Sequence, residues 1–133
     1  MILLDTNYIL RFLLKDNEDM YKISKDTITT NKCFIDNEVL AEVVFALLKV
    51  YKVSKSDIRT TLEKFISFEN IILNGKSTTI SALKIFDERN LDFVDAILCA
   101  KSKKYTVKTF DKKLNKCIES YKHNETLIYQ RLE

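Results

Sequence analysis

Four acidic residues stand at positions where a carboxylate is unusual: Asp5, Glu42, Asp95 and Asp111. Asp5 ends the apolar run ILL, and Asp111 directly follows the strand-like segment TVKTF. Glu42 interrupts VLAEVVFALL, and Asp95 stands within LDFVDAILCA, two segments with the composition of apolar helices. Because a carboxylate among apolar side chains is costly unless it has a partner, Glu42 and Asp95 each need one.

The chemistry that four such acids support is the binding of a hard divalent cation. Strand ends and helix first turns meet at one edge of a parallel α/β domain, where four carboxylates would repel one another. Mg²⁺ or Mn²⁺, as one or two ions, takes oxygen ligands and pairs with phosphate substrates. Such ions lower the pKa of a water molecule and hold a phosphodiester oxygen, so hydrolysis needs no histidine. That suits a chain with one histidine, His123, which we expect at the surface.

Short apolar runs alternate with helical patterns along the whole chain, and this alternation positions the acids. The expected strands span 2–5, 33–36, 70–73, 105–110 and 126–131. The expected helices span 7–14, 18–30, 37–52, 55–67, 78–89, 92–104 and 111–120. This order favours an α/β fold with a mainly parallel sheet covered on both faces, in which ligands bind beyond the carboxyl ends of the strands. No linker or repeat divides the chain, so we expect one domain over residues 1–133.

The composition excludes several kinds of site. The chain has 133 residues, of which 46% are hydrophobic and 31% are charged, as in globular proteins. Its single glycine, Gly75, excludes a phosphate-binding P-loop or a dinucleotide fingerprint, both of which need several glycines. The net charge of +3 is too small to indicate nucleic-acid binding by itself.

The cysteines and the hydropathy predict a setting inside the cell. Cys33, Cys99 and Cys117 are an odd number with wide spacing, which argues against a disulfide framework and against zinc. We therefore expect buried, reduced thiols and a cytoplasmic location. No apolar run reaches the roughly 18 residues of a membrane span, and the N-terminus lacks the pattern of a signal peptide.

Four short motifs together resemble the PIN-domain family, and most closely its VapC-type toxins. They are LDTN at 4–7, LAEVVFALL at 40–48, LDFVDAILCA at 91–100 and TFDKKL at 109–114. Each motif alone is weak, but their order and spacing fit the family over essentially the whole chain. The resemblance implies a three-layer α/β/α sandwich with a central, mainly parallel sheet.

The resemblance also implies roles for particular residues. Asp5, Glu42, Asp95 and Asp111 would be the catalytic metal ligands, bordered by the polar side chains of Thr6, Asn7 and Thr109. The implied activity is Mg²⁺- or Mn²⁺-dependent endoribonuclease cleavage. The implied partners are an RNA substrate, a second copy of the chain in a homodimer, and a cognate antitoxin that occludes the site.

A basic tract surrounds Asp111. Residues 101–116 hold seven lysines and two aromatic residues. Lys108, Lys112 and Lys113 are candidates for contacts with RNA phosphates, although a solvated helix face explains the lysines as well. Tyr105 and Phe110 could stack on bases, but we expect both in the core. Arg11, on an otherwise apolar helix, is a further candidate for RNA or partner contact, with a peripheral salt bridge as the alternative.

Three other functions are alternatives to the nuclease. A phosphatase with a strand-end aspartate nucleophile needs a second aspartate two residues later, where this chain has Asn7. A receiver-like phosphoacceptor domain needs paired acids that are missing here. The third alternative is a non-catalytic PIN-like module that binds RNA or protein. The helices at 39–52 and 55–67 also carry several large apolar residues, namely Phe45, Val50, Tyr51, Phe65 and Phe68. We expect core packing to explain most of them, and a dimer or antitoxin surface would explain a surplus.

Overall fold

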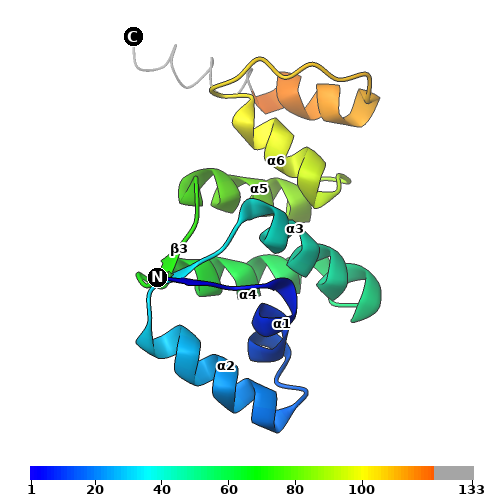
Figure 1. The fold of residues 1–133 in the computed structure, drawn as a ribbon. Coiled ribbons are helices and arrows are strands. Elements are labelled where there is room, and N and C mark those ends of the chain that lie inside the picture. The colour runs from blue at the N-terminus through cyan, green and yellow to red at the C-terminus, as the bar shows by residue number, and fades with distance from the viewer. Residues whose placement is uncertain (122–133) are drawn as a thin grey trace. The chain divides into compact units, whose positions relative to one another are not determined.

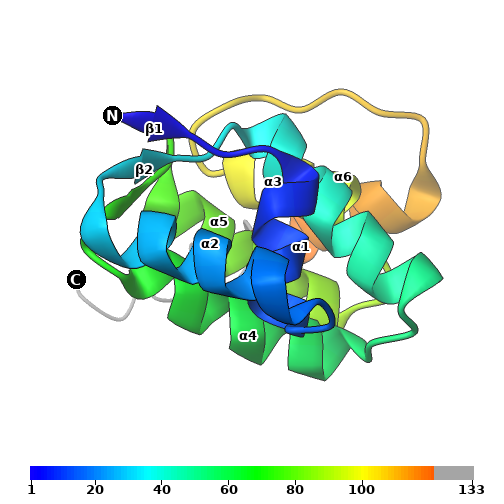
Figure 2. The same cartoon turned by 60° about the horizontal axis from the view of Figure 1, so that its bottom comes forward.

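Three short parallel strands form the sheet of the N-terminal half in the computed structural model. They are β1 (Ile2–Leu3), β2 (Cys33–Phe34) and β3 (Ile71–Ile72), with β2 in the centre. Cys33 lies opposite Ile2 on one side and Ile71 on the other. Figure 2 shows β1 beside β2, and Figure 1 labels β3. Backbone hydrogen bonds from Leu4 to Phe34 and from Ile35 to Ile72 continue the pairing by one residue beyond each ladder. The first three expected strands are therefore confirmed, with shorter bounds.

The structure describes residues 1–121, and these belong to two units of the chain. The N-terminal unit is Met1–Lys76, and the C-terminal unit is Ser77–Glu133, described as far as residue 121. The expected strand at 126–131 and His123 lie outside the described residues. No helix among the described residues is long and apolar enough to cross a membrane.

The helices of the N-terminal unit connect and cover the strands. They are α1 (Thr6–Leu14), α2 (Glu18–Thr30), α3 (Asn37–Phe45), the π-helical turn η1 (Ala46–Val50) and α4 (Lys55–Ser67). α1 packs against α2 and α3, and α4 packs against β3 and η1 (Figure 1). Side chains cap two of these helices: Asn17 accepts from the backbone N–H of Met20, and Ser54 accepts from that of Asp57.

An aromatic cluster fixes α1 against its neighbours. The ring of Phe12 stacks on that of Tyr21 from α2, with centroids 6.1 Å apart, and lies 5.7 Å from that of Phe65 in α4. Fully buried aliphatic residues, among them Ile9 and Ile58, continue this core toward the sheet. Packing of this kind holds the first turn of α1 in place, where Asp5 and Thr6 stand.

The C-terminal unit is helical in its described part. α5 (Lys76–Glu88) is followed by α6 (Phe93–Lys101), and residues 112–121 form a further helix. The rings of Phe86 and Phe93 meet edge to face at 5.8 Å and join α5 to α6. The three expected helices of this unit are thus confirmed within a few residues at their ends.

The predicted strand at 105–110 is wrong. Residue 105 is in a bend, and residues 106–110 have no regular secondary structure. The expected burial of its aromatic residues is also wrong, because Tyr105 and Phe110 are both exposed. A segment forms a strand only if it pairs with another strand, which often comes from a distant part of the sequence. The order of side chains within the segment does not reveal whether such a strand is available.

The cysteines differ from expectation in the C-terminal unit. Cys99 of α6 and Cys117 of the helix at 112–121 form a disulfide, with their Cα atoms 6.2 Å apart. Cys33 is a free, buried thiol, as predicted. The odd count concealed this pair, because 18 residues separate two cysteines that the fold of the unit brings together.

Candidate functional site

Asp5 stands where β1 gives way to α1. It is the N-cap of α1, and its Oδ1 accepts a hydrogen bond of 2.8 Å from the backbone N–H of Tyr8. An N-cap carboxylate is stabilised by the unpaired N–H groups and the dipole of the helix. The residue is nevertheless exposed, so the other carboxylate oxygen remains open to solvent or a ligand.

Glu42 reaches the same end of α1. Thr6 Oγ1 donates a hydrogen bond of 2.7 Å to Glu42 Oε2, which joins the first turn of α1 to α3. The flanking residues Val43 and Val44 are buried, but Glu42 itself is exposed. The expected cost of burying this carboxylate is therefore absent, while the expected partner is present and is Thr6.

Asp95 lies in the first turn of α6, after the N-cap Asp92. Asp92 Oδ1 accepts from the backbone N–H of Asp95 at 2.8 Å. Burial raises the pKa of the Asp95 carboxyl above its usual value, and the negative charges of Asp92 and Asp111 raise it further. The structure thus brings Asp95 and Asp111 within electrostatic reach of each other in the C-terminal unit.

Asp111 begins the helix at 112–121. Its Oδ1 accepts from the backbone N–H of Leu114 at 2.8 Å, and its own backbone N–H donates to Thr109 Oγ1 at 3.0 Å. The side chain of Asn115 donates to the carbonyl oxygen of Thr109 at 2.9 Å. Thr109 therefore orders the turn that presents Asp111, and Asp111 is exposed.

These contacts define two pairs of acids, each in its own unit. Asp5 and Glu42 are linked through Thr6, and Asp95 and Asp111 interact through their charges. Every donor atom is a carboxylate oxygen, which is the ligand type that Mg²⁺ and Mn²⁺ prefer. Within residues 1–121, no three or more histidine, cysteine or acidic side chains come together closely enough to hold a metal ion. The carboxylates match a hard cation in ligand type, and Asp95 is repelled by Asp92 and Asp111, but the described residues do not gather the four acids into one cluster.

The remaining candidates are placed as follows. Asn7 is exposed in the first turn of α1, and Lys108, Lys112 and Lys113 are exposed around Asp111. None of the three lysines forms an ion pair in the part of the chain that the structure describes. They are free to meet an anion, and their contact with RNA stays a prediction.

Arg11 is held by its own unit. Its guanidinium donates to Asp16 Oδ2 and to the hydroxyl of Tyr51, each at 2.8 Å, and its side chain is only 15% exposed. The salt bridge weighed as an alternative is therefore present. Contact of Arg11 with RNA or a partner remains a prediction.

The large apolar residues of the helices predicted at 39–52 and 55–67 differ in their exposure. Phe65 is buried, whereas Phe45, Val50, Tyr51 and Phe68 are exposed. Core packing therefore explains only the first of these five. The expectation that core packing explains most of them is therefore wrong, and the four others are exposed apolar side chains in α3, in η1 and at the C-caps of η1 and α4.

Comparisons with known proteins identify the family of this chain and one relative. The model of the PIN domain family matches residues 2–117. A VapC ribonuclease of Aquifex aeolicus (strain VF5) is 30% identical over 112 residues, which cover 81% of this chain and 83% of that protein. No solved structure matches the chain. The match includes all four acids, and the structure has a parallel sheet with helices between its strands. The chain therefore belongs to the PIN domain family and has its α/β fold.

Proposed function

We propose that the protein is a divalent-metal-dependent endoribonuclease that hydrolyses RNA phosphodiester bonds. The observation that carries the proposal is the similarity to a VapC ribonuclease over most of both chains, in a family match that contains Asp5, Glu42, Asp95 and Asp111. These four acids would supply the oxygen ligands for one or two ions. Mg²⁺ or Mn²⁺ would act there as a Lewis acid that lowers the pKa of a water and stabilises charge on the phosphate.

The protein groups prepare this chemistry by position. The backbone N–H of Tyr8 orients the Asp5 carboxylate, and the hydroxyl of Thr6 orients that of Glu42. The backbone N–H of Leu114 does the same for Asp111. Carboxylates fixed in this way need no reorganisation when a cation binds, which favours binding and catalysis.

The basic tract supports RNA as the substrate. Lys108, Lys112 and Lys113 are exposed beside Asp111 and would neutralise backbone phosphates. Tyr105 and Phe110 are exposed aromatic rings on the same segment, which suits stacking on unpaired bases. Such contacts favour single-stranded RNA but do not specify a sequence.

The decisive experiment measures cleavage of a panel of RNAs by the purified protein with Mg²⁺, with Mn²⁺ and with a chelator. Asp5→Asn should abolish cleavage while leaving the fold intact, because asparagine caps a helix as well as aspartate does. Glu42→Gln should have the same effect. Its matched control is Glu38→Gln, one turn earlier on α3, which should remain fully active.

Two results would contradict the proposal. Retained cleavage by Asp5→Asn in a nuclease-free preparation would remove Asp5 from the mechanism. Metal-independent binding of RNA by wild-type protein, without cleavage of any RNA in the panel, would favour the non-catalytic PIN-like module instead.

We further propose that the nuclease is the toxin of a toxin–antitoxin pair and acts in the cytoplasm as a homodimer. The exposed residues Phe45, Val50, Tyr51 and Phe68 offer an apolar surface for a second copy or for the antitoxin. Expression of the chain alone should arrest growth, and the product of a neighbouring small reading frame should relieve the arrest. Harmless accumulation of soluble, catalytically active protein would contradict the toxin role and leave the nuclease chemistry standing.

A further inference from the structure

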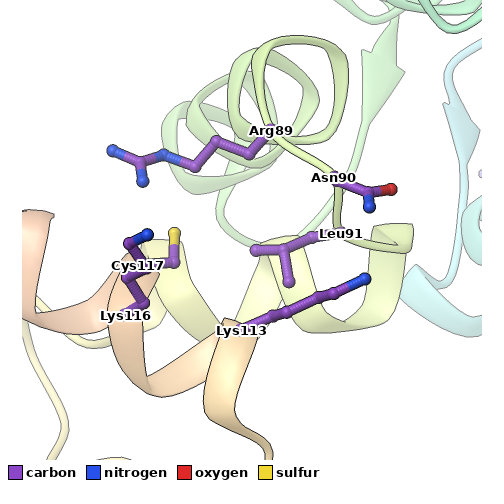
Figure 3. A pocket seen from close by; sticks show the side chains of 6 residues that line it. All are labelled: Arg89, Asn90, Leu91, Lys113, Lys116 and Cys117. Atoms are coloured by element: carbon purple, nitrogen blue, oxygen red, sulfur yellow. The ribbon is translucent and has the colours of Figure 1, made fainter.

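A pocket of about 280 Å³ lies within the C-terminal unit, between the end of α5 and the helix at 112–121. Arg89, Asn90 and Leu91 form one wall, from the connection between α5 and α6 (Figure 3). The opposite wall comes from the helix at 112–121 and consists of Lys113, Lys116 and Cys117. Of these six residues, only Lys113 is among the RNA-binding candidates predicted from the sequence.

The lining of the pocket is strongly cationic. Arg89, Lys113 and Lys116 contribute three positive charges, and no acidic side chain lines the pocket in the described part of the unit. Lys113 and Lys116 stand three residues apart on one helix face, and neither has an ion-pair partner within residues 1–121. The pocket therefore presents uncompensated positive charge.

Arg89 is already oriented toward this helix. Its Nη2 donates a hydrogen bond of 2.9 Å to Ser120 Oγ, one turn beyond Lys116. A guanidinium has five N–H donors in a planar fork, so this bond leaves others for an anion. Arginine held in one orientation loses less entropy on binding a phosphate than a free side chain does.

The pocket also has an apolar side and a limited size. Leu91 and Cys117 are both buried, and Cys117 is held in place by its disulfide with Cys99. A volume of about 280 Å³ is close to the lower end of ligand pockets, roughly 300 Å³. These dimensions suit one nucleotide, with its phosphate on the cations and its sugar against the apolar side.

We propose that this pocket binds one nucleotide phosphate, as a site beside the acids of the C-terminal unit. The pocket and these acids are carried by the same chain segments: Lys113 is two residues after Asp111, and Asn90 is two residues before Asp92. An RNA strand seated here would place a neighbouring phosphate near those acids. The identification of the ligand as a segment of RNA rests on the proposed function, whereas the phosphate chemistry rests on the pocket.

The test is binding of a labelled single-stranded RNA by anisotropy in the presence of a chelator, over a range of salt concentrations. The test variant is Lys113→Gln with Lys116→Gln, and the charge-matched control is Lys64→Gln with Lys84→Gln, exposed lysines elsewhere. Loss of the one phosphate contact in the pocket should lower the magnitude of the slope of log K against log salt by about 0.7, the contribution of one phosphate of a single strand. Lys113→Arg with Lys116→Arg should keep the slope of the wild-type protein.

A second measurement separates the two sources of phosphate. Titration of the same proteins with a nucleoside monophosphate measures binding of a free nucleotide. The RNA assay measures binding of a strand. A loss confined to the glutamine pair in either assay supports the site and names its source. If the glutamine pair matches the control pair in both assays, the proposal is overturned.

Failure of this proposal is distinguishable from failure of the nuclease function. The binding assays contain no metal and require no cleavage. Weakened binding by the glutamine pair in a protein that cleaves no RNA would keep the pocket and remove the nuclease. Normal cleavage by wild-type protein, together with unaltered binding by the glutamine pair, would keep the nuclease function and remove the pocket as a phosphate site.

Discussion

The hydroxyl of Thr6 donates a hydrogen bond of 2.7 Å to Glu42 Oε2, across 36 residues of sequence. Thr6 directly follows Asp5, which caps α1, so one short segment both carries an acid and orients another. The bond joins the first turn of α1 to the middle of α3. A single threonine thereby couples the two acids of the N-terminal unit.

Replacing Thr6 by valine should reduce activity while preserving the fold. Valine keeps the shape of the side chain but cannot donate to Glu42, whose carboxylate then loses its orientation. Loss of a group that orients a metal ligand typically lowers activity or metal affinity about 10- to 100-fold. We expect a fall in this range in metal-dependent cleavage, measured across a metal titration with saturating RNA.

The matched variant is Thr6→Ser, which retains the hydroxyl. It should recover most of the activity that Thr6→Val loses. Equal activity of wild type and Thr6→Val at limiting metal would show that the hydrogen bond has no part in the reaction.

Asp95→Asn should leave the thermal stability of the metal-free protein unchanged or higher. Burial, Asp92 and Asp111 raise the pKa of Asp95 above its ordinary value of 3.8, so its charged form is less favourable in the folded than in the unfolded state. The gain in folding stability from asparagine is therefore present at pH values above the raised pKa of Asp95. It disappears as the pH falls through that pKa to below the ordinary value, where both states are protonated.

The measurement is the melting temperature in chelator from about pH 7 down to about pH 3, on either side of the usual aspartate range. Asp57→Asn is the control, an exposed acid in the first turn of α4. A clear drop in the melting temperature of Asp95→Asn at neutral pH would mark the carboxylate as a structural group.

Removal of the disulfide should destabilise the C-terminal unit. Cys99 and Cys117 are 18 residues apart, and closing a loop of this size stabilises a protein by about 3 kcal/mol in the chain-entropy model. Cys99→Ala with Cys117→Ala should lower the free energy of unfolding by up to that amount. A reductant should lower the stability of the wild-type protein similarly and leave the double variant unchanged. A wild-type protein insensitive to reductant would argue against the cross-link.

Cys33 should resist alkylation in the folded protein. Burial raises the pKa of its thiol, with a smaller opposing effect from the N-terminal amino group, so little reactive thiolate forms near neutral pH. Mass spectrometry after iodoacetamide treatment should find no modification in the native state. Denaturation should expose one thiol, and denaturation with reduction should expose three. Two further modifications without a reductant would contradict the disulfide.

Local signals in the sequence predicted most of the helices. The bounds of α2 and α4 agree with the predicted 18–30 and 55–67, and the structure shows that Asn17 and Ser54 cap them. The predicted helix at 37–52 is α3 followed by η1, and a π-helical turn leaves no mark in the pattern of apolar residues. A strand at 105–110 would have needed to pair with a segment far away in the sequence, and this predicted strand is absent.

The candidate site shows the same division between local and distant information. The sequence identified Glu42 as an acid that needs a partner, but only the fold shows that this partner is Thr6. Arg89, Asn90 and Lys116 carry no motif, because their shared pocket arises from two segments that meet in the C-terminal unit. The disulfide was missed for a similar reason, since an odd number of cysteines does not exclude one pair.

The capping bonds of Asp5 and Asp111 bear on ion selectivity. Each residue commits one carboxylate oxygen, Oδ1, to a backbone N–H, from Tyr8 and Leu114 respectively. With the caps intact, one lone pair of Oδ1 is already engaged, so coordination through the second oxygen alone is the readier mode for each residue. Ca²⁺ favours six to eight oxygens, often from bidentate carboxylates, whereas Mg²⁺ needs few protein ligands and retains water. Helix capping would therefore discriminate against the larger ion.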